Sequence, residues 1–223
     1  MFIVFDLDGT LIDGYAGITD ALGFAMERLG REPLPEERVR AMVGEGLERL
    51  IEKAVGAGFV DRGVALFRER YAVVVDEKTW LLPDVAAVLS RLDSEGHRMA
   101  VASNKPAHFT RRILEAKGVA GRFQAIAGPD AATPPKPDPT MLRGLMGAVG
   151  ADPAGTLVVG DMEIDYQMAT AGGCRSVLVP GGSRSAEELS RIPADAHLAR
   201  LGELPGWIAA AASRRSSGAE RAG

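Results

Sequence analysis

The hexapeptide Asp6-Leu7-Asp8-Gly9-Thr10-Leu11 directly follows an apolar run, residues 1–5. A short apolar run of this kind is typical of a buried strand, so Asp6 and Asp8 are expected where a strand gives way to a loop. In an open α/β sheet this position lies at the crevice where ligands bind. Two carboxylates so close together are costly to hold unless a cation or a shared proton lies between them. The sequence therefore predicts a polar site at the end of the first strand.

A calcium-binding loop is the main alternative for an Asp-x-Asp-Gly sequence. The EF-hand loop needs glycine at its sixth position and glutamate at its twelfth. Counted from Asp6, the glycine Gly9 stands at the fourth position, and the twelfth position is Gly17. The sequence therefore argues against an EF-hand.

Composition restricts the class of protein. The chain has 223 residues, a formal net charge of -4, a pI near 5.5 and 5% aromatic residues. An acidic chain with few aromatic residues lacks the basic surface and the stacking platforms that bind nucleic acid. No apolar stretch approaches the roughly 20 residues that span a bilayer, and no basic region precedes the first apolar run. With one cysteine, Cys174, we expect a cytoplasmic protein, a monomer or a homodimer, with no nucleic-acid or membrane partner.

Residues 14–80 follow a helical pattern. From Ile18 to Leu29 the apolar residues recur at i, i+3, i+4, i+7, i+8 and i+11, as in an amphipathic helix. Two more helices are expected near residues 47–55 and 60–76. Because no strand pattern interrupts this stretch, we expect an all-α unit inserted after the first strand.

The remainder of the chain alternates between strands and helices. Beyond the first strand, further strands are expected at residues 98–103, 123–127, 156–160, 175–179 and, at the edge, 196–198. Such alternation implies a parallel sheet with helices on its faces. The predicted fold class is therefore α/β, a Rossmann-like parallel sheet flanked by helices, with an inserted all-α domain. The expected boundaries are 1–13 and 81–212 for the core, 14–80 for the helical insertion and 213–223 for a flexible tail.

Four polar clusters follow predicted strands or lie in loops. They are Asp6/Asp8/Thr10, Ser103-Asn104-Lys105, Lys136, and Asp161 with Asp165. Because the strands of a parallel sheet all end at one edge, at least three of these clusters are expected to meet. Carboxylates, a lysine, a hydroxyl group and an amide together suit a hard cation and a polyanion. Mg²⁺ is the cation that fits such oxygen ligands best.

Each cluster by itself also has an ordinary structural interpretation. Asp161 could cap the following helix, Lys136 could lie on the surface in its proline-rich segment, and Ser103-Asn104 could form a simple turn. The order of the clusters after successive strands, together with the first motif, favours a functional site.

Together the clusters resemble the motifs of the haloacid dehalogenase superfamily, in the branch with a helical cap inserted after the first strand. The matching segments are 6–11, 103–105, 136–139 (Lys-Pro-Asp-Pro) and 160–165 (Gly-Asp-Met-Glu-Ile-Asp). The resemblance covers residues 1 to about 200 and, within the superfamily, points to phosphoglycolate-phosphatase-like enzymes. Two positions depart from the pattern: Gly14, where relatives often have serine, and Met162, where a small hydroxyl residue is common.

The resemblance implies a Mg²⁺-dependent phosphatase for a small phosphorylated metabolite, with 2-phosphoglycolate as the lead substrate. Asp6 would be the nucleophile that forms an aspartyl-phosphate. Asp8 would protonate the leaving oxygen and then activate water, which requires a raised pKa that the neighbouring Asp6 would favour. Dehalogenases of the superfamily lack an aspartate at the position of Asp8, so its presence favours phosphate chemistry.

The resemblance also assigns the binding groups. Mg²⁺ would be held by Asp6, by Asp161 and by the carbonyl of Asp8, with Asp165 as an outer ligand. The groups expected to bind phosphate are Thr10, Ser103, Asn104 and, bridging to Asp6, Lys136.

The helical cap is where the leaving group would be recognised. Its segment 43–49 (Val-Gly-Glu-Gly-Leu-Glu-Arg) is the candidate substrate-facing loop, and Arg49 could pair with a substrate carboxylate. A surface pair between Glu45 and Arg49, spaced i, i+4, is the alternative. Two other functions remain open: a phosphomutase of the β-phosphoglucomutase type, and a catalytically idle binding protein of the same fold.

Overall fold

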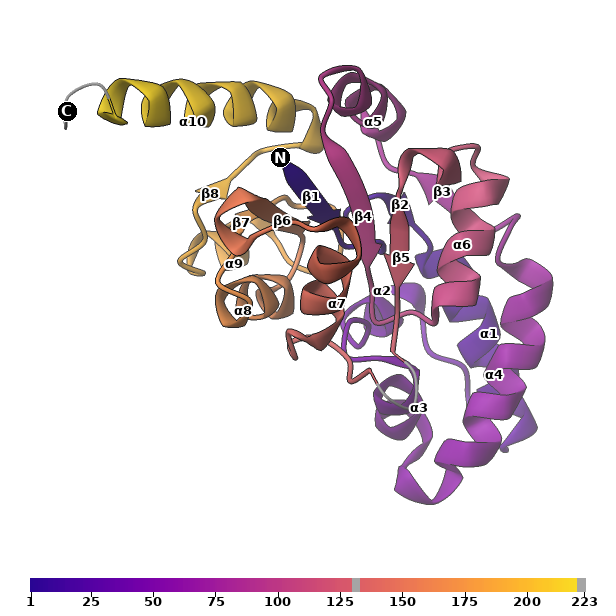
Figure 1. The fold of residues 1–223 in the computed structure, drawn as a ribbon. Helices are drawn as coiled ribbons and strands as arrows, with labels where there is room; N and C mark the ends of the chain where they lie inside the picture. Colours follow the sequence, from indigo (N-terminus) through magenta and orange to yellow (C-terminus); the bar gives the residue numbers. More distant parts are fainter. Residues whose placement is uncertain (130–132, 220–223) are drawn as a thin grey trace.

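A computed structural model describes residues 1–129 and 133–219. Its main sheet has the strand order β5-β4-β1-β6-β7-β8, and all neighbouring strands run parallel (Figure 1). The strands are β1 (Phe2–Phe5), β4 (Arg98–Ala102), β5 (Ala125–Ala127), β6 (Thr156–Gly160), β7 (Arg175–Leu178) and β8 (Ala196–His197). The predicted α/β fold with a parallel sheet is confirmed.

Different helices cover the two faces of this sheet. Side chains of a strand alternate between faces, so Ile3 and Phe5 join one buried cluster whereas Phe2 and Val4 join another. Outside the segment between β1 and β4, whose helices also join the first cluster, that cluster receives residues from α5 (Val85–Ser94), α6 (Ala107–Ala116) and α10 (Leu204–Ala219). The second cluster receives residues from α7 (Thr140–Val149) and α8 (Glu163–Ala171). A parallel sheet that is apolar on both faces requires helices on both of them.

The C-terminal helix extends beyond the expected start of the flexible tail. The sequence predicts a tail over residues 213–223, but the backbone of α10 is helical through Ala219. The Ser213 hydroxyl donates to the Ala209 carbonyl at 3.1 Å, one turn earlier in the same helix. Residues 220–223 lie outside the described residues. The short helix α9 (Ala186–Ser190), which no sequence pattern indicated, precedes β8.

The chain between β1 and β4 forms a helical block. Its helices are α1 (Tyr15–Arg28), α2 (Glu36–Arg40), α3 (Leu47–Val55) and α4 (Val60–Val74). Figure 1 shows these helices grouped at the lower right of the molecule, away from α10 at the upper left. Asp20 of α1 lies 2.5 Å from both Arg70 Nε and Lys78 Nζ, so ion pairs join the first helix to the last helix and the segment that follows it.

Two short strands join the helical block to the sheet. β2 (Ile12–Asp13) pairs antiparallel with β3 (Trp80–Leu81), where the sequence indicated no strand. The pairing holds the two places at which the chain enters and leaves the block side by side. A strand of two residues is too short to show a periodicity of its own.

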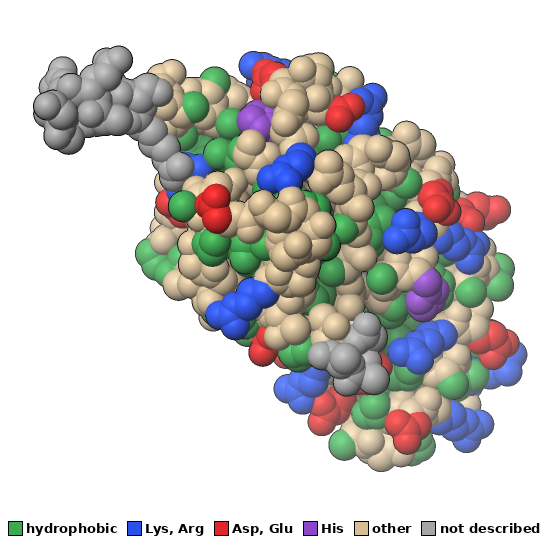
Figure 2. Space-filling model, in the orientation of Figure 1, with side chains coloured by type: hydrophobic (Ala, Val, Ile, Leu, Met, Phe, Trp, Pro, Cys, Tyr) green, Lys and Arg blue, Asp and Glu red, His purple; other side chains and the backbone are tan. Residues whose placement is uncertain are grey.

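Charge is mixed on the molecular surface that Figure 2 shows, where acidic and basic side chains are interspersed. Within the described ranges, no helix combines the length and the apolar character that crossing a membrane requires.

Candidate active site

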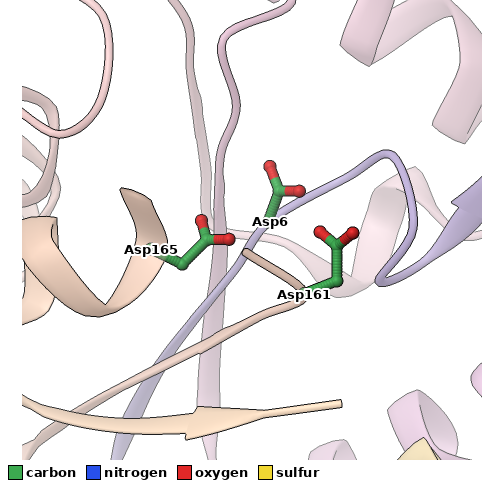
Figure 3. A group of neighbouring side chains, drawn as sticks. All are labelled: Asp6, Asp161 and Asp165. Atoms are coloured by element: carbon green, nitrogen blue, oxygen red, sulfur yellow. The ribbon is translucent and has the colours of Figure 1, made fainter. Parts of the chain in front are cut away.

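Three buried carboxylates meet at the carboxyl edge of the sheet. Asp6 follows β1, Asp161 follows β6 and Asp165 lies in the first turn of α8; Figure 3 shows their side chains together. One oxygen from each carboxylate lies within 4.8 Å of the others. Residues so distant in the chain meet because neighbouring parallel strands end at the same edge.

Lys136 neutralises two of these carboxylates. Its Nζ lies 2.5 Å from Asp6 Oδ1 and 2.7 Å from Asp165 Oδ1. Burial lowers the pKa of Lys136, but Asp165 and Asp6 outweigh that effect and raise it, which keeps the ammonium group charged. Since Lys136 is only 4% exposed, the alternative of a surface lysine is wrong.

Asp161 is a buried carboxylate whose two oxygens accept no hydrogen bond within the described part of the chain. Burial, followed by the charges of Asp6 and Asp165, raises its pKa well above the usual value. It does not cap α8, because it accepts no hydrogen bond from the described backbone there; Asp165 instead accepts one from the N–H of Met162, the residue before the helix, at 3.1 Å. An ionised Asp161 therefore needs a cation. Three buried carboxylates, one of them with both oxygens unpaired, fit a divalent ion that prefers oxygen ligands, such as Mg²⁺.

Asp8 lies beside this group, and its carboxylate interacts with a different lysine. Asp8 Oδ2 is 3.0 Å from Lys105 Nζ, which also donates to the Tyr71 hydroxyl at 2.7 Å. Burial raises the pKa of Asp8, Lys105 opposes the shift and Asp6 adds to it. The upward direction expected from Asp6 is thus confirmed, with burial as the larger cause. The sequence placed Lys105 in the second cluster but gave it no role; its contact with Tyr71 shows that it faces the helical block.

Asn104 connects three parts of the site. Its Oδ1 accepts from the Lys136 N–H at 2.7 Å, and its Nδ2 donates to the carbonyls of Lys136 at 3.2 Å and Gly44 at 2.8 Å. The adjacent Ser103 is buried, and its Oγ accepts from the Lys105 N–H at 3.2 Å. The loop after β4 therefore orients both lysines of the site and contacts the helical block through Gly44.

The site opens into a cavity between the sheet edge and the helical block. Its polar lining contains six of the groups named above: Asp6, Asp8, Ser103, Asn104, Lys105 and Lys136.

Two residues expected to bind the substrate do not line this cavity. Thr10 is 1% exposed, and its Oγ1 has no hydrogen-bond partner in the described part of the chain. The Arg49 side chain is 56% exposed and pairs with Glu52 and, at 3.7 Å, with Glu45. The alternative of a surface pair is correct for Arg49, contrary to its predicted contact with the substrate.

The two departures from the family pattern have structural consequences. A Cβ at Gly14 would lie 2.9 Å from Asp8 Oδ1, so the glycine leaves space beside that carboxylate. Met162 is 7% exposed, lines the cavity and packs on Gly44, where a Cβ would meet its Sδ and Cε at 2.6 Å. Met162 therefore contributes an apolar contact between α8 and the helical block.

Two glycines pack directly against the carboxylate of Asp161. A Cβ at Gly182 would lie 1.8 Å from Asp161 Oδ2, and one at Gly9 would lie 2.4 Å from the same atom. The sequence offers little signal for this role of Gly182, because its loop is adjacent to Asp161 only in the folded chain. Any side chain at residue 182 must displace the carboxylate or the backbone.

We expect Gly182→Ala to lower the activity of this site by about tenfold or more and to reduce stability by about 1–3 kcal/mol, because the added methyl overlaps Asp161. Activity assays and thermal unfolding check this result. The control is Gly144→Ala in α7, where a Cβ meets nothing within 4 Å; it should leave activity unchanged and stabilise the helix by about 1 kcal/mol. Equal activity in the two variants would contradict the role of Gly182.

Comparison with known proteins agrees with this geometry. The family model of haloacid dehalogenase-like hydrolases matches residues 3–179. The chain belongs to this family.

Among curated members, a phosphoglycolate phosphatase of Yersinia pseudotuberculosis is 32% identical over 209 residues, covering 91% of this chain and 90% of its own. A phosphoglycolate phosphatase of Aquifex aeolicus is 33% identical over 180 residues, covering 81% and 84%. A solved hydrolase of the haloacid dehalogenase-like family from Streptococcus pneumoniae superposes with a TM-score of 0.86 at 20% identity, covering 93% and 97%. That likeness concerns the fold alone.

Proposed function

We propose that this haloacid dehalogenase-like hydrolase cleaves a small phosphate monoester through an aspartyl-phosphate on Asp6, with Mg²⁺ as cofactor. The family and its curated phosphatase relatives make the chain a hydrolase of phosphoric monoesters. The observation that carries the proposal is the group of three buried carboxylates beside the buried Lys136, with both oxygens of Asp161 unpaired.

In the proposed reaction, a carboxylate oxygen of Asp6 attacks phosphorus and the bond to the leaving alkoxide breaks. Lys136, held at 2.5 Å from Asp6, would place its positive charge beside the oxygens of the transferring group. Asp8, whose raised pKa favours its protonated form, would give its proton to the leaving oxygen. It would then take a proton from the water that hydrolyses the aspartyl-phosphate.

The residues proposed to hold Mg²⁺ are Asp6, Asp161 and Asp165, with the carbonyl of Asp8 as a further ligand. When bound, the ion supplies positive charge that offsets the negative charge of the phosphoryl oxygens. Ser103 and Asn104 line the cavity beside Lys136 and are proposed to bind the phosphoryl group. Thr10 and Arg49 are not included, since neither lines the cavity.

The helical block is proposed to act as the cap, covering the site during the reaction and excluding water. Support comes from its direct contacts with the loop after β4, from Gly44 to Asn104 and from Tyr71 to Lys105. The β2–β3 pair, where the chain enters and leaves the block, is the proposed hinge.

The test is phosphate release from a panel of small phosphomonoesters, with Mg²⁺ and with a chelator. We expect at least one ester to be hydrolysed with Mg²⁺ and activity to fall by about 100-fold or more when the metal is removed. The panel includes 2-phosphoglycolate, the substrate suggested by the relatives' names. Release that is unaffected by chelation would contradict the metal site, and no release from any ester would contradict the phosphatase proposal.

A phosphomutase would use the same acids but return the phosphoryl group to a sugar. Incubation of a sugar phosphate with a bisphosphate primer separates the two functions, because a mutase yields the isomer whereas a phosphatase yields free phosphate. An idle binding protein would bind such compounds without turnover. The cluster of buried carboxylates argues against it, because such a cluster, with Asp161 unpaired, is costly to a fold that does not use it.

A further inference from the structure

The part of the cavity that faces the phosphate site is apolar. Its lining comes from α1, α3 and α4 of the helical block and from α6 and α8 of the sheet domain, through Ile18, Leu47, Leu50, Phe67, Phe109 and Ile164. Aromatic contacts fix part of this wall. Tyr71 stacks on Phe67 with ring centroids 5.2 Å apart and meets Phe109 edge-on at 5.0 Å. The leaving group of a bound ester would contact this wall.

Both cations of the cavity lining are already engaged. Lys136 pairs with Asp6 and Asp165 at the phosphate site, and Lys105 pairs with Asp8 while it donates to Tyr71. Neither arginine nor histidine occurs among the described residues that line the cavity. A second anionic group on the substrate would therefore have to compete with Asp8 and Tyr71 for Lys105, because the described lining offers no further cation outside the phosphate site.

The orientation of α3 explains why Arg49 does not supply this charge. Leu47, Leu50 and Ile51 follow the i, i+3, i+4 spacing, and the latter two are buried. Arg49 lies between them in sequence and so points to a different side of the helix, where it pairs with Glu45 and Glu52. Packing of the leucine face against the cavity therefore directs the arginine into solvent.

We infer that the substrate of the proposed phosphatase is a monoester whose alcohol is uncharged and apolar, rather than one that carries a second anion. An ionised carboxylate against this wall would lose its hydration without gaining a partner, which is costly. An apolar group would instead gain from leaving water. The inference rests on the proposed function and departs from 2-phosphoglycolate as the preferred substrate.

Three esters of primary alcohols test the inference with native protein and Mg²⁺. Isobutyl phosphate matches 2-phosphoglycolate in shape, with two methyl groups in place of the carboxylate oxygens, and benzyl phosphate fills more of the cavity. We expect kcat/KM for isobutyl phosphate to exceed that for 2-phosphoglycolate by about tenfold or more, and benzyl phosphate to be better still. A value for 2-phosphoglycolate that equals or exceeds the value for isobutyl phosphate would overturn the inference and leave the phosphatase function intact. Absence of release from all esters would overturn both.

Variants in α3 test whether the apolar wall of the cavity causes the substrate preference. Leu50→Arg should remove the preference, lowering the ratio of kcat/KM for isobutyl phosphate over 2-phosphoglycolate by about tenfold or more. If that variant does not fold, Leu50→Ala carries the test: it should lower kcat/KM for benzyl phosphate by about tenfold and change that for 2-phosphoglycolate little. Arg49→Ala is the matched control, one residue away and solvent-facing, and should leave all three esters unchanged. A selective loss of 2-phosphoglycolate hydrolysis in Arg49→Ala would overturn the inference.

Discussion

Replacing Asp6 by asparagine is expected to reduce phosphate release by roughly 10⁴-fold or more, the scale of loss seen when a catalytic nucleophile is removed. An amide cannot attack phosphorus as a carboxylate does, and it also removes one negative charge from the proposed Mg²⁺ ligands. The Asp6→Asn side chain retains an oxygen for Lys136, which lies 2.5 Å from the native carboxylate. We therefore expect the fold to survive, as checked by circular dichroism and thermal unfolding beside the phosphate assay.

The matched control for this substitution is Asp61→Asn, at an exposed residue in the first turn of α4. The same loss of a carboxylate there should leave the rate unchanged within about twofold. Trapping offers a second readout, since acid quench of the native enzyme during turnover should retain labelled phosphate on the protein and Asp6→Asn should retain none. Label on the variant would show that another residue is the nucleophile.

Asp161→Asn is expected to remove the response of the protein to Mg²⁺. A ligand present at 100 times its Kd stabilises the folded state by about 2.7 kcal/mol. For a chain of this length, that corresponds to a rise in Tm of roughly 5–10 °C. We expect native protein to show a Tm rise with Mg²⁺ and Asp161→Asn to show none at the same concentration. The activity of Asp161→Asn should also fall by about 100-fold or more, as loss of a metal ligand predicts.

The thermal stability of the metal-free protein distinguishes a cation-binding Asp161 from one with only a structural role. The pKa of Asp161 is raised in the folded state. The folded protein is therefore more stable when this carboxyl group is protonated than when it is ionised. That contribution is complete below the usual value of 3.8 and is lost as the pH rises through the raised value. Without Mg²⁺ at pH 8, Asp161→Asn should therefore unfold at a higher temperature than native protein. A lower Tm for the variant under these conditions would contradict the proposed cation site.

Local patterns predicted the sheet because its strands are short apolar runs bounded by polar residues. Phe2–Phe5 and Thr156–Gly160 are buried along their whole length, as such runs indicate. The β2–β3 pair was not predicted, because each strand has two residues and forms only by pairing with the other. Helix α10 extends past the expected start of the tail at residue 213, since serine and arginine permit a helix without requiring one.

The phosphate side of the site was also predictable from sequence. Asp6 and Asp161 each follow a strand, and the topology of a parallel sheet is enough to bring them together. The contacts made by Lys105 and Gly182 were not predictable in this way. Lys105 is oriented by Tyr71 of the helical block, and Gly182 approaches Asp161 from a different loop. Neither contact has a periodicity or spacing that a single sequence reveals.

By itself, the sequence determined the parallel sheet and the acids and lysine that meet at its edge, because strand burial follows from local apolar patterns and parallel strands end at one edge. The tertiary structure alone decided what faces that site. Leu50 points to the cavity and Arg49 points away because of how α3 packs within the helical block. The contact of Asn104 with Gly44 then sets that block against the sheet. Such placement depends on contacts between residues far apart in the chain, which local patterns do not encode.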